Sequence, residues 1–104
     1  MDLLSQIKKS MRIKHTELDD DITADIEAGT LDLIRVGIQP YQKENDEYVT
    51  DENGKKVMKD DALICKAIEL YCKAQADYQG KQEQYTAAYE KLRDSLSLCG
   101  DYIE

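Results

Sequence analysis

The chain has 104 residues, of which 41% are hydrophobic and 35% are charged, and its formal net charge is −8 at pH 7. This length allows one domain with a modest core, and the negative charge argues against tight binding to DNA, RNA or anionic lipid surfaces. No apolar run approaches the ~20 residues of a membrane-spanning helix, and the first residues lack the order of a signal peptide. We therefore expect one soluble, intracellular domain comprising residues 1–104, with no membrane contact.

Helices are expected, because one Pro and five Gly leave few residues that break a helix. Leu3, Ile7 and Met11 share one helical face and predict a short first helix. A second helix is expected to begin near Thr16, which has the spacing of a capping box with Asp19. Its apolar stripe consists of Leu18, Ile22, Ile26, Gly29 and Leu33.

Two glycines of the second helix carry separate predictions. Gly29 lies inside the apolar stripe, where Gly costs about 1 kcal/mol relative to Ala, so we expect another helix to pass close to it. Gly37 follows the stripe and precedes Pro40, an order that is typical of a C-terminal cap. The second helix is therefore expected to end just before Gly37.

The helical pattern stops over residues 41–59. The dipeptide Asn53-Gly54 in this segment favours a type I′ hairpin turn, because both central residues of that turn need positive φ. The flanking candidate strands are Tyr48-Val49-Thr50 and Val57-Met58. Two isolated strands are marginally stable in water, so we expect a β-hairpin arm that is either flexible or stabilised by a partner.

The remaining chain predicts two more helices. Asp60 and Asp61 are good N-terminal caps for a third helix, whose apolar residues cover more than one face, as in a buried central helix. Gly80 marks a break, and a fourth helix is expected from about residue 81 to residue 98, before Gly100. The predicted fold is mostly α: a small helical bundle of about four helices, with a short β-hairpin arm between helices 2 and 3.

The residue pattern offers no catalytic, cofactor-binding or metal-binding site. His15 is the single His, the three Cys lack the spacing of zinc ligands, and no Gly-rich phosphate loop or Gly-x-Ser-x-Gly motif is present. The acidic run at residues 17–21 does not match a calcium loop, and acids at a helix N-terminus are favourable in any case. We read that run as a solvated helix start or an electrostatic contact, and we expect neither an enzyme nor a cofactor.

Protein contacts are the more promising role for the seven Tyr, which supply all the aromatic bulk of a chain without Trp or Phe. Tyr is enriched at protein interfaces, although the helical spacing of Tyr71, Tyr78, Tyr85 and Tyr89 also fits packing within the fold. The candidate interaction residues, on the arm and the last helix, are Tyr48, Val49, Asn53, Gly54, Val57, Met58, Tyr85 and Tyr89.

Three stretches carry a resemblance to a known family. Met11-Arg12-Ile13 precedes the acidic helix start at residues 18–22, residues 61–71 form an apolar helix that opens with an acid, and residues 89–98 close the pattern. In this order the stretches resemble the phage head–tail connector family, whose members are also known as head-completion, adaptor or DNA-packaging proteins. Together they span most of the chain.

The resemblance implies a structural virion component that forms a homo-oligomeric ring between the portal and the tail. Its implied partners are the portal protein, a tail or head-completion protein, and further copies of itself. The ring would help retain or pass DNA without sequence-specific binding. The implied location is the virion head–tail interface, and the host cytoplasm during assembly.

Two other functions stay open at this point. An intracellular helical adaptor or regulator unrelated to virions would share the acidic, helical composition, and the position of its gene would separate it from a connector. An enzyme would need a concave pocket with several convergent polar groups, which the acidic run would have to supply.

Overall fold

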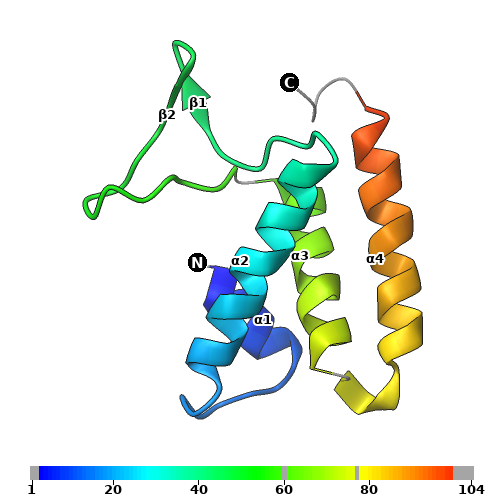
Figure 1. The fold of residues 1–104 in the computed structure, drawn as a ribbon. Coiled ribbons are helices and arrows are strands. Elements are labelled where there is room, and N and C mark those ends of the chain that lie inside the picture. Colours follow the sequence, from blue (N-terminus) through cyan, green and yellow to red (C-terminus); the bar gives the residue numbers. More distant parts are fainter. Residues whose placement is uncertain (1–2, 60, 77, 100–104) are drawn as a thin grey trace.

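The computed structural model describes residues 3–59, 61–76 and 78–99, and Figure 1 shows how they are arranged. The helices are α1 (Leu3–Ser10), α2 (Asp19–Arg35), α3 (Ala62–Gln75) and α4 (Gln82–Ser97), with a short 3-10 turn η1 (Tyr78–Gly80) before α4. The strands β1 (Lys43–Glu44) and β2 (Glu47–Tyr48) form an antiparallel pair between α2 and α3. The predicted mostly α fold, with a hairpin arm between the second and third helices, is confirmed.

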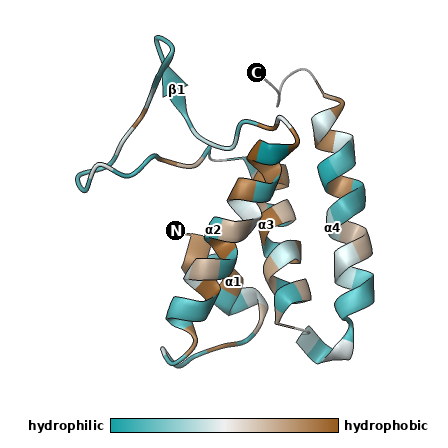
Figure 2. Cartoon of the chain, viewed as in Figure 1, coloured by the Kyte–Doolittle hydropathy of each residue, from teal (hydrophilic) through white to brown (hydrophobic). Residues whose placement is uncertain are grey.

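Helix α3 is the centre of the fold and packs against α1, α2 and α4. Its Ile64, Ala67 and Ile68 are completely buried. Figure 2 shows hydrophobic residues concentrated along α3, whereas the arm is mostly hydrophilic. The core cluster comprises Ile7, Met11, Ile22, Leu33, Ile38, Ile64, Ala67, Ile68, Cys72, Tyr89 and Leu96. The prediction of a buried central helix is therefore confirmed.

The start of α3 also follows the prediction. The Asp61 carboxylate accepts hydrogen bonds from the backbone N–H groups of Leu63 and Ile64, at 2.8 and 3.2 Å. These bonds satisfy two of the amide groups that lack partners inside the first turn of a helix. Asp60 and Gly100, which were expected to help begin α3 and to end α4, lie outside the described residues.

The start of α2 differs from the prediction. The helix begins at Asp19, and Leu18 precedes it without any side-chain capping bond, so the capping box of Thr16 and Asp19 is wrong. The Asp19 carboxylate instead forms an ion pair with Lys8 of α1, at 2.7 Å. A long-range charge contact has therefore replaced the local cap, and the acids of the first turn still favour the positive end of the helix dipole.

Gly29 and Tyr71 mark the close approach of α2 and α3. Gly29 is buried, and a Cβ atom built on it would lie 3.1 Å from Cδ1 of the Tyr71 ring. The absence of a side chain therefore lets the aromatic ring lie directly on the backbone of α2. The prediction of a neighbouring helix at Gly29 is confirmed.

The end of α2 is a Schellman motif. The N–H of Ile38 donates to the carbonyl of Leu33 at 3.0 Å, and the N–H of Gly37 donates to that of Ile34 at 2.9 Å. Gly37 has φ of +93°, a conformation that Gly adopts without steric cost. Gly37 is thus the predicted C-terminal cap.

Helix α1 ends in the same motif with a different residue. The N–H of Ile13 donates to the carbonyl of Lys8 at 2.9 Å, and that of Arg12 donates to Lys9 at 3.1 Å. Arg12 therefore occupies the position that Gly37 occupies in α2, and its φ is +58°. This left-handed conformation costs an L-residue about 1–2 kcal/mol.

We expect the substitution Arg12→Gly to raise the free energy of unfolding by about 1 kcal/mol, because Gly relieves the left-handed strain. The control Lys9→Gly, inside α1, is expected to lower it by about 0.5–1 kcal/mol, since Gly weakens a helix interior. Urea unfolding followed by circular dichroism measures both. A destabilised Arg12→Gly protein would contradict the account of this turn.

The hairpin turn lies earlier than predicted. Lys43 pairs with Tyr48, and the strands are joined by Asn45 and Asp46. These two residues have φ of 54° and 65°, as a type I′ turn requires. Asn and Asp tolerate the left-handed region better than other non-glycine residues.

The type I′ turn predicted at Asn53-Gly54 is wrong. Only Gly54 of the pair has positive φ, at 78°. One oxygen of the Asp51 carboxylate accepts the N–H groups of Asn53 and Lys55, at 2.9 and 3.0 Å. This side-chain bonding stabilises a wider turn over residues 51–55.

The arm therefore has three limbs, which meet in a closed triangle of backbone hydrogen bonds. Val49 donates its N–H to Gln42 at 3.0 Å, Val57 donates to Val49 at 2.9 Å, and Gln42 donates to Val57 at 2.8 Å. The Gln42 side-chain amide also donates to the Met58 carbonyl at 2.9 Å. Figure 1 shows the two turns projecting from the helical body at separate tips.

Candidate protein-interaction surfaces

Tyr48 lies in β2 of the arm and is 38% exposed. Its ring meets the edge of the Tyr41 ring, with 6.1 Å between the centroids. The ammonium groups of Lys56 and Lys43 lie 4.0 and 4.9 Å from the centroid of the Tyr48 ring. The Tyr48 hydroxyl also accepts a hydrogen bond from the Gln39 side chain, at 3.2 Å. These contacts hold an accessible aromatic ring in one orientation between two cations.

The other candidate residues of the arm divide into tip and base. Asn53 and Gly54 are exposed at the second turn, and Val49 and Val57 are half-buried in the hydrogen-bonded triangle. Met58 is half-buried and packs against the core. The tips and Tyr48 are therefore open to a partner. The valines join the limbs of the arm to one another, and Met58 packs the arm against the helical body.

The two candidate tyrosines of α4 lie in different surroundings. Tyr89 is only 4% exposed, and its ring lies 5.2 Å from that of Tyr71. Tyr85 is half-buried beside Tyr78, with the Lys73 ammonium 5.6 Å from both rings. The structure thus places Tyr89 in the core and Tyr85 at the edge of the bundle. Tyr85 is also distant in sequence from the arm.

Asp32 joins α2 to α4 through its carboxylate. The carboxylate accepts hydrogen bonds from the Tyr89 hydroxyl at 2.5 Å, from Arg93 Nη1 at 3.1 Å and from Arg35 Nη2 at 2.6 Å. Burial alone would raise the pKa of Asp32, but the bonds from Tyr89, Arg35 and Arg93 outweigh it and leave the pKa below its ordinary value. Burial, and then the same carboxylate, raise the pKa of Tyr89.

No sequence motif near Asp32 indicates its contact with α4. Its partner Arg93 lies 61 residues away along the chain, so only the fold brings the two side chains together. The one local signal is Arg35, three residues after Asp32 on the same helix.

Several large apolar side chains lie in solvent. The most exposed are Leu98 at 87% and Leu31 at 64%, followed by Leu63 at 47% and Ile34 at 41%. Single exposed leucines are common on protein surfaces. Leu31 and Ile34, however, are three residues apart and therefore share the outer face of α2.

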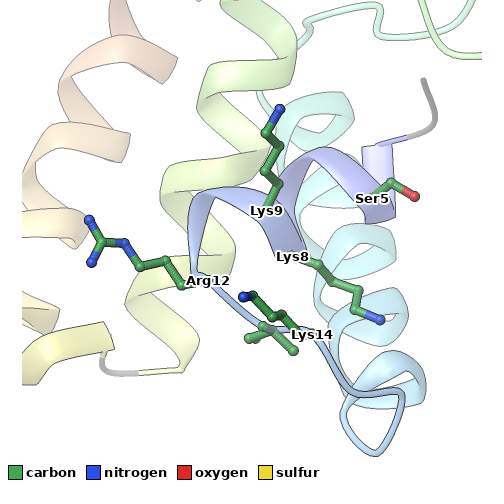
Figure 3. Close-up of a pocket in the computed structure, with 6 residues that line it drawn as sticks. Ser5, Lys8, Lys9, Arg12 and Lys14 are labelled. Carbon is green, nitrogen blue, oxygen red and sulfur yellow. The ribbon is translucent and has the colours of Figure 1, made fainter.

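A basic hollow of about 660 Å³ lies at the end of α1. Figure 3 shows side chains that line it. Its lining residues are Ser5, Lys8, Lys9, Arg12, Ile13 and Lys14. Lys8 extends toward α2, where it pairs with Asp19, whereas Lys9, Arg12 and Lys14 point outward in different directions. Three of these cations, Lys8, Lys9 and Arg12, are also favourable at the negative end of the α1 dipole. This local explanation accounts for them in the sequence, so the sequence does not indicate a binding surface there.

Two general features of the described residues bear on function. No described helix has the length and apolar character needed to cross a membrane. Among residues 3–59, 61–76 and 78–99, no three His, Cys, Asp or Glu side chains are grouped so that they could hold a metal ion. Cys72 is a buried free thiol, and burial raises its pKa to about 12, so this thiol is unreactive.

The comparison with known proteins identifies the family. A family model described as phage connector protein matches residues 3–102. No curated protein and no solved structure matches the chain. Because the family match covers nearly the whole sequence, the chain belongs to the phage connector protein family, whose members are structural components of the virion.

Proposed function

We propose that the chain is a subunit of a homo-oligomeric ring that joins the portal protein to a tail or head-completion protein. The match of the connector family to residues 3–102 carries this proposal. In this role the protein acts at the virion head–tail interface after assembly in the host cytoplasm. DNA passes through the ring and is retained without sequence-specific binding, without an enzymatic step and without a cofactor.

The shape and surface of the subunit suit assembly. The described residues extend over 42 × 33 × 19 Å, so the body is flat and offers two broad faces. A ring of identical subunits needs two different patches of the same chain to meet. Exposed apolar residues on α2 and just after α4, chiefly Leu31 and Leu98, supply surface that contacts between proteins would bury.

The arm is the part of the subunit that we assign to contact with a neighbour or with the portal. Its strands have two residues each and are exposed, and short exposed strands gain stability when another chain adds to their edge. Tyr48 lies in β2 with its ring already oriented by Lys43 and Lys56. A pre-oriented Tyr loses little conformational entropy on binding.

The substitution Tyr48→Ala tests the arm. Truncation of a Tyr that anchors an interface costs about 2 kcal/mol or more, so we expect binding to the portal to weaken at least tenfold. The matched control is Tyr78→Ala, which removes a half-buried Tyr of η1 that is not among the candidate interaction residues. Both proteins are compared by titration against purified portal, and equal binding by wild type and Tyr48→Ala would remove the arm from the contact.

Light scattering behind size exclusion, with and without purified portal, tests the proposed function itself. The expected result is a complex whose mass equals the portal plus a ring of subunits. A chain that stays monomeric and ignores the portal would contradict the proposal. Membership of the connector family favours this function over an adaptor unrelated to virions, and a gene placed between portal and tail genes would support it further.

A further inference from the structure

We propose that neighbouring subunits of the ring meet head to tail through opposite charges. In this contact, the basic hollow at the end of α1 receives the acidic outer face of α2 from a second copy of the chain. The inference rests on the proposed ring and adds the two surfaces that build it. It concerns parts of the molecule that the arm and the Asp32 junction do not use.

The first surface is strongly positive within a negative protein. Residues 8–14 contain four cations and no acid, although the chain as a whole carries −8. Lys9, Arg12 and Lys14 are exposed and form no ion pair with any described residue. Figure 3 shows their side chains around the rim of the hollow, and Ile13 adds an apolar side chain to its lining.

Arg12 gives an independent reason to assign a binding role to the hollow. It holds a left-handed turn, at φ of +58°, that Gly would adopt without strain, as Gly37 does at the end of α2. No described residue pairs with its guanidinium. Strained residues persist where function requires the side chain, and here that side chain is an outward cation.

The second surface is the outer face of α2. Residues 17–32 contain seven acids and no Lys or Arg. Asp20 and Glu27 are exposed and unpaired among the described residues, and they lie about 10 Å apart along one side of the helix. Leu31 and Ile34 continue the same side, so the face combines two carboxylates with an exposed apolar end.

The two surfaces open in different directions, as a heterologous ring contact requires. Helix α1 packs against α2 and α3 on its inner side, and in Figure 3 α1 lies in front of both helices. The exposed face of α2 points away from its own contacts with α1 and α3. One copy can therefore present its hollow to the α2 face of the next copy.

Net charge favours a second copy over a nucleic acid as the occupant. Two subunits of charge −8 repel each other unless a positive patch of one faces a negative patch of the other. A DNA duplex would extend beyond the hollow toward Asp21 and Asp25, which line an adjoining hollow that shares Ile13. Phosphates of a long duplex would be repelled there, whereas the proposed contact needs only two carboxylates, about 10 Å apart, to meet the basic residues.

Paired charge reversals on the full chain test the contact. The first variant is Lys9→Glu with Arg12→Glu, and the second is Asp20→Lys with Glu27→Lys. A control, Lys81→Glu with Lys91→Glu, changes the net charge as much as the first variant but lies on and beside α4. The combined variant carries all four interface reversals and keeps the net charge at −8.

Ring formation on purified portal is measured by light scattering, after circular dichroism has shown that each variant is folded. We expect each interface pair alone to reduce ring formation at least tenfold, the control to leave it within twofold of wild type, and the combined variant to recover it. Arg12→Gly should also weaken the ring without lowering the melting temperature, which separates binding from folding.

Three results would overturn the contact. The first reversal could assemble like the control, or the combined variant could fail to recover. Alternatively, the first reversal could form normal rings yet lose binding to duplex DNA in an anisotropy titration, which would assign the hollow to phosphates. A wild-type chain that forms no ring would instead overturn the proposed function, and the contact with it.

Discussion

The substitution Ile68→Ala is expected to lower the free energy of unfolding by about 2–5 kcal/mol. Ile68 is completely buried in α3, the helix on which the other three pack. Truncation leaves a cavity that these helices cannot fill without moving. Because small domains have total stabilities of about 5–15 kcal/mol, this loss places the protein close to unfolding.

The matched control is Leu63→Ala on the same helix. Leu63 is 47% exposed, so its truncation should change stability by no more than about 0.5 kcal/mol. Urea unfolding followed by circular dichroism compares the two variants. Similar losses at Ile68 and Leu63 would contradict the assignment of α3 as the central core helix.

The substitution Asp32→Asn is expected to cost about 2 kcal/mol at pH 7. It removes the charge that accepts hydrogen bonds from Tyr89 and Arg93 on α4, and hydrogen bonds to charged groups contribute about 1.5–3 kcal/mol. Asp94→Asn is the control, because Asp94 also contacts Arg93 but its side chain is 70% exposed. An exposed pair of that kind contributes less than about 1 kcal/mol.

The stabilisation that Asp32 contributes should decrease as the pH falls into strong acid. Hydrogen bonds from Tyr89, Arg35 and Arg93 outweigh burial and hold the folded-state pKa of Asp32 below its ordinary value. The stabilisation is therefore complete above that value and fades as the pH falls through the lower folded-state pKa. We expect wild type and Asp32→Asn to differ at pH 7 and to converge in strong acid. A difference that grows in acid would contradict the hydrogen-bonding scheme.

The parts of the fold that depend on neighbouring residues could be predicted from the sequence. The apolar stripe of α2, the Asp61 cap and the Gly37 cap each arise within one or two helical turns. Even the contact of Gly29 with α3 could be predicted from the sequence. Gly destabilises a helix interior, so a Gly inside an apolar helical face indicates close packing there.

The predictions that failed were those in which a side chain outside the expected motif bound its polar groups. The ion pair from Lys8 engages Asp19 and replaces the expected capping box. The Asp51 carboxylate holds the turn that contains Asn53-Gly54 in a wider form, and the type I′ turn lies at Asn45-Asp46. In both cases the local pattern was present, but a different partner satisfied the polar groups.

The interaction surfaces could be predicted only in part from the sequence. Tyr48 and the Asn53 tip do lie on the exposed arm, where a partner can reach them. The junction between Asp32 and Arg93 joins residues 61 positions apart, so no periodicity could indicate it. The positive φ of Arg12 is likewise a property of the backbone, and it becomes informative only once the end of α1 is known.

Cryo-electron microscopy of the purified portal mixed with an excess of the chain would show whether the subunits form a ring. We expect a closed ring of subunits on the portal, with the arm touching a neighbour or the portal. Between adjacent subunits, the hollow around Arg12 should face the Asp20 side of α2. Portal particles without added density, or with isolated subunits that do not touch one another, would contradict it.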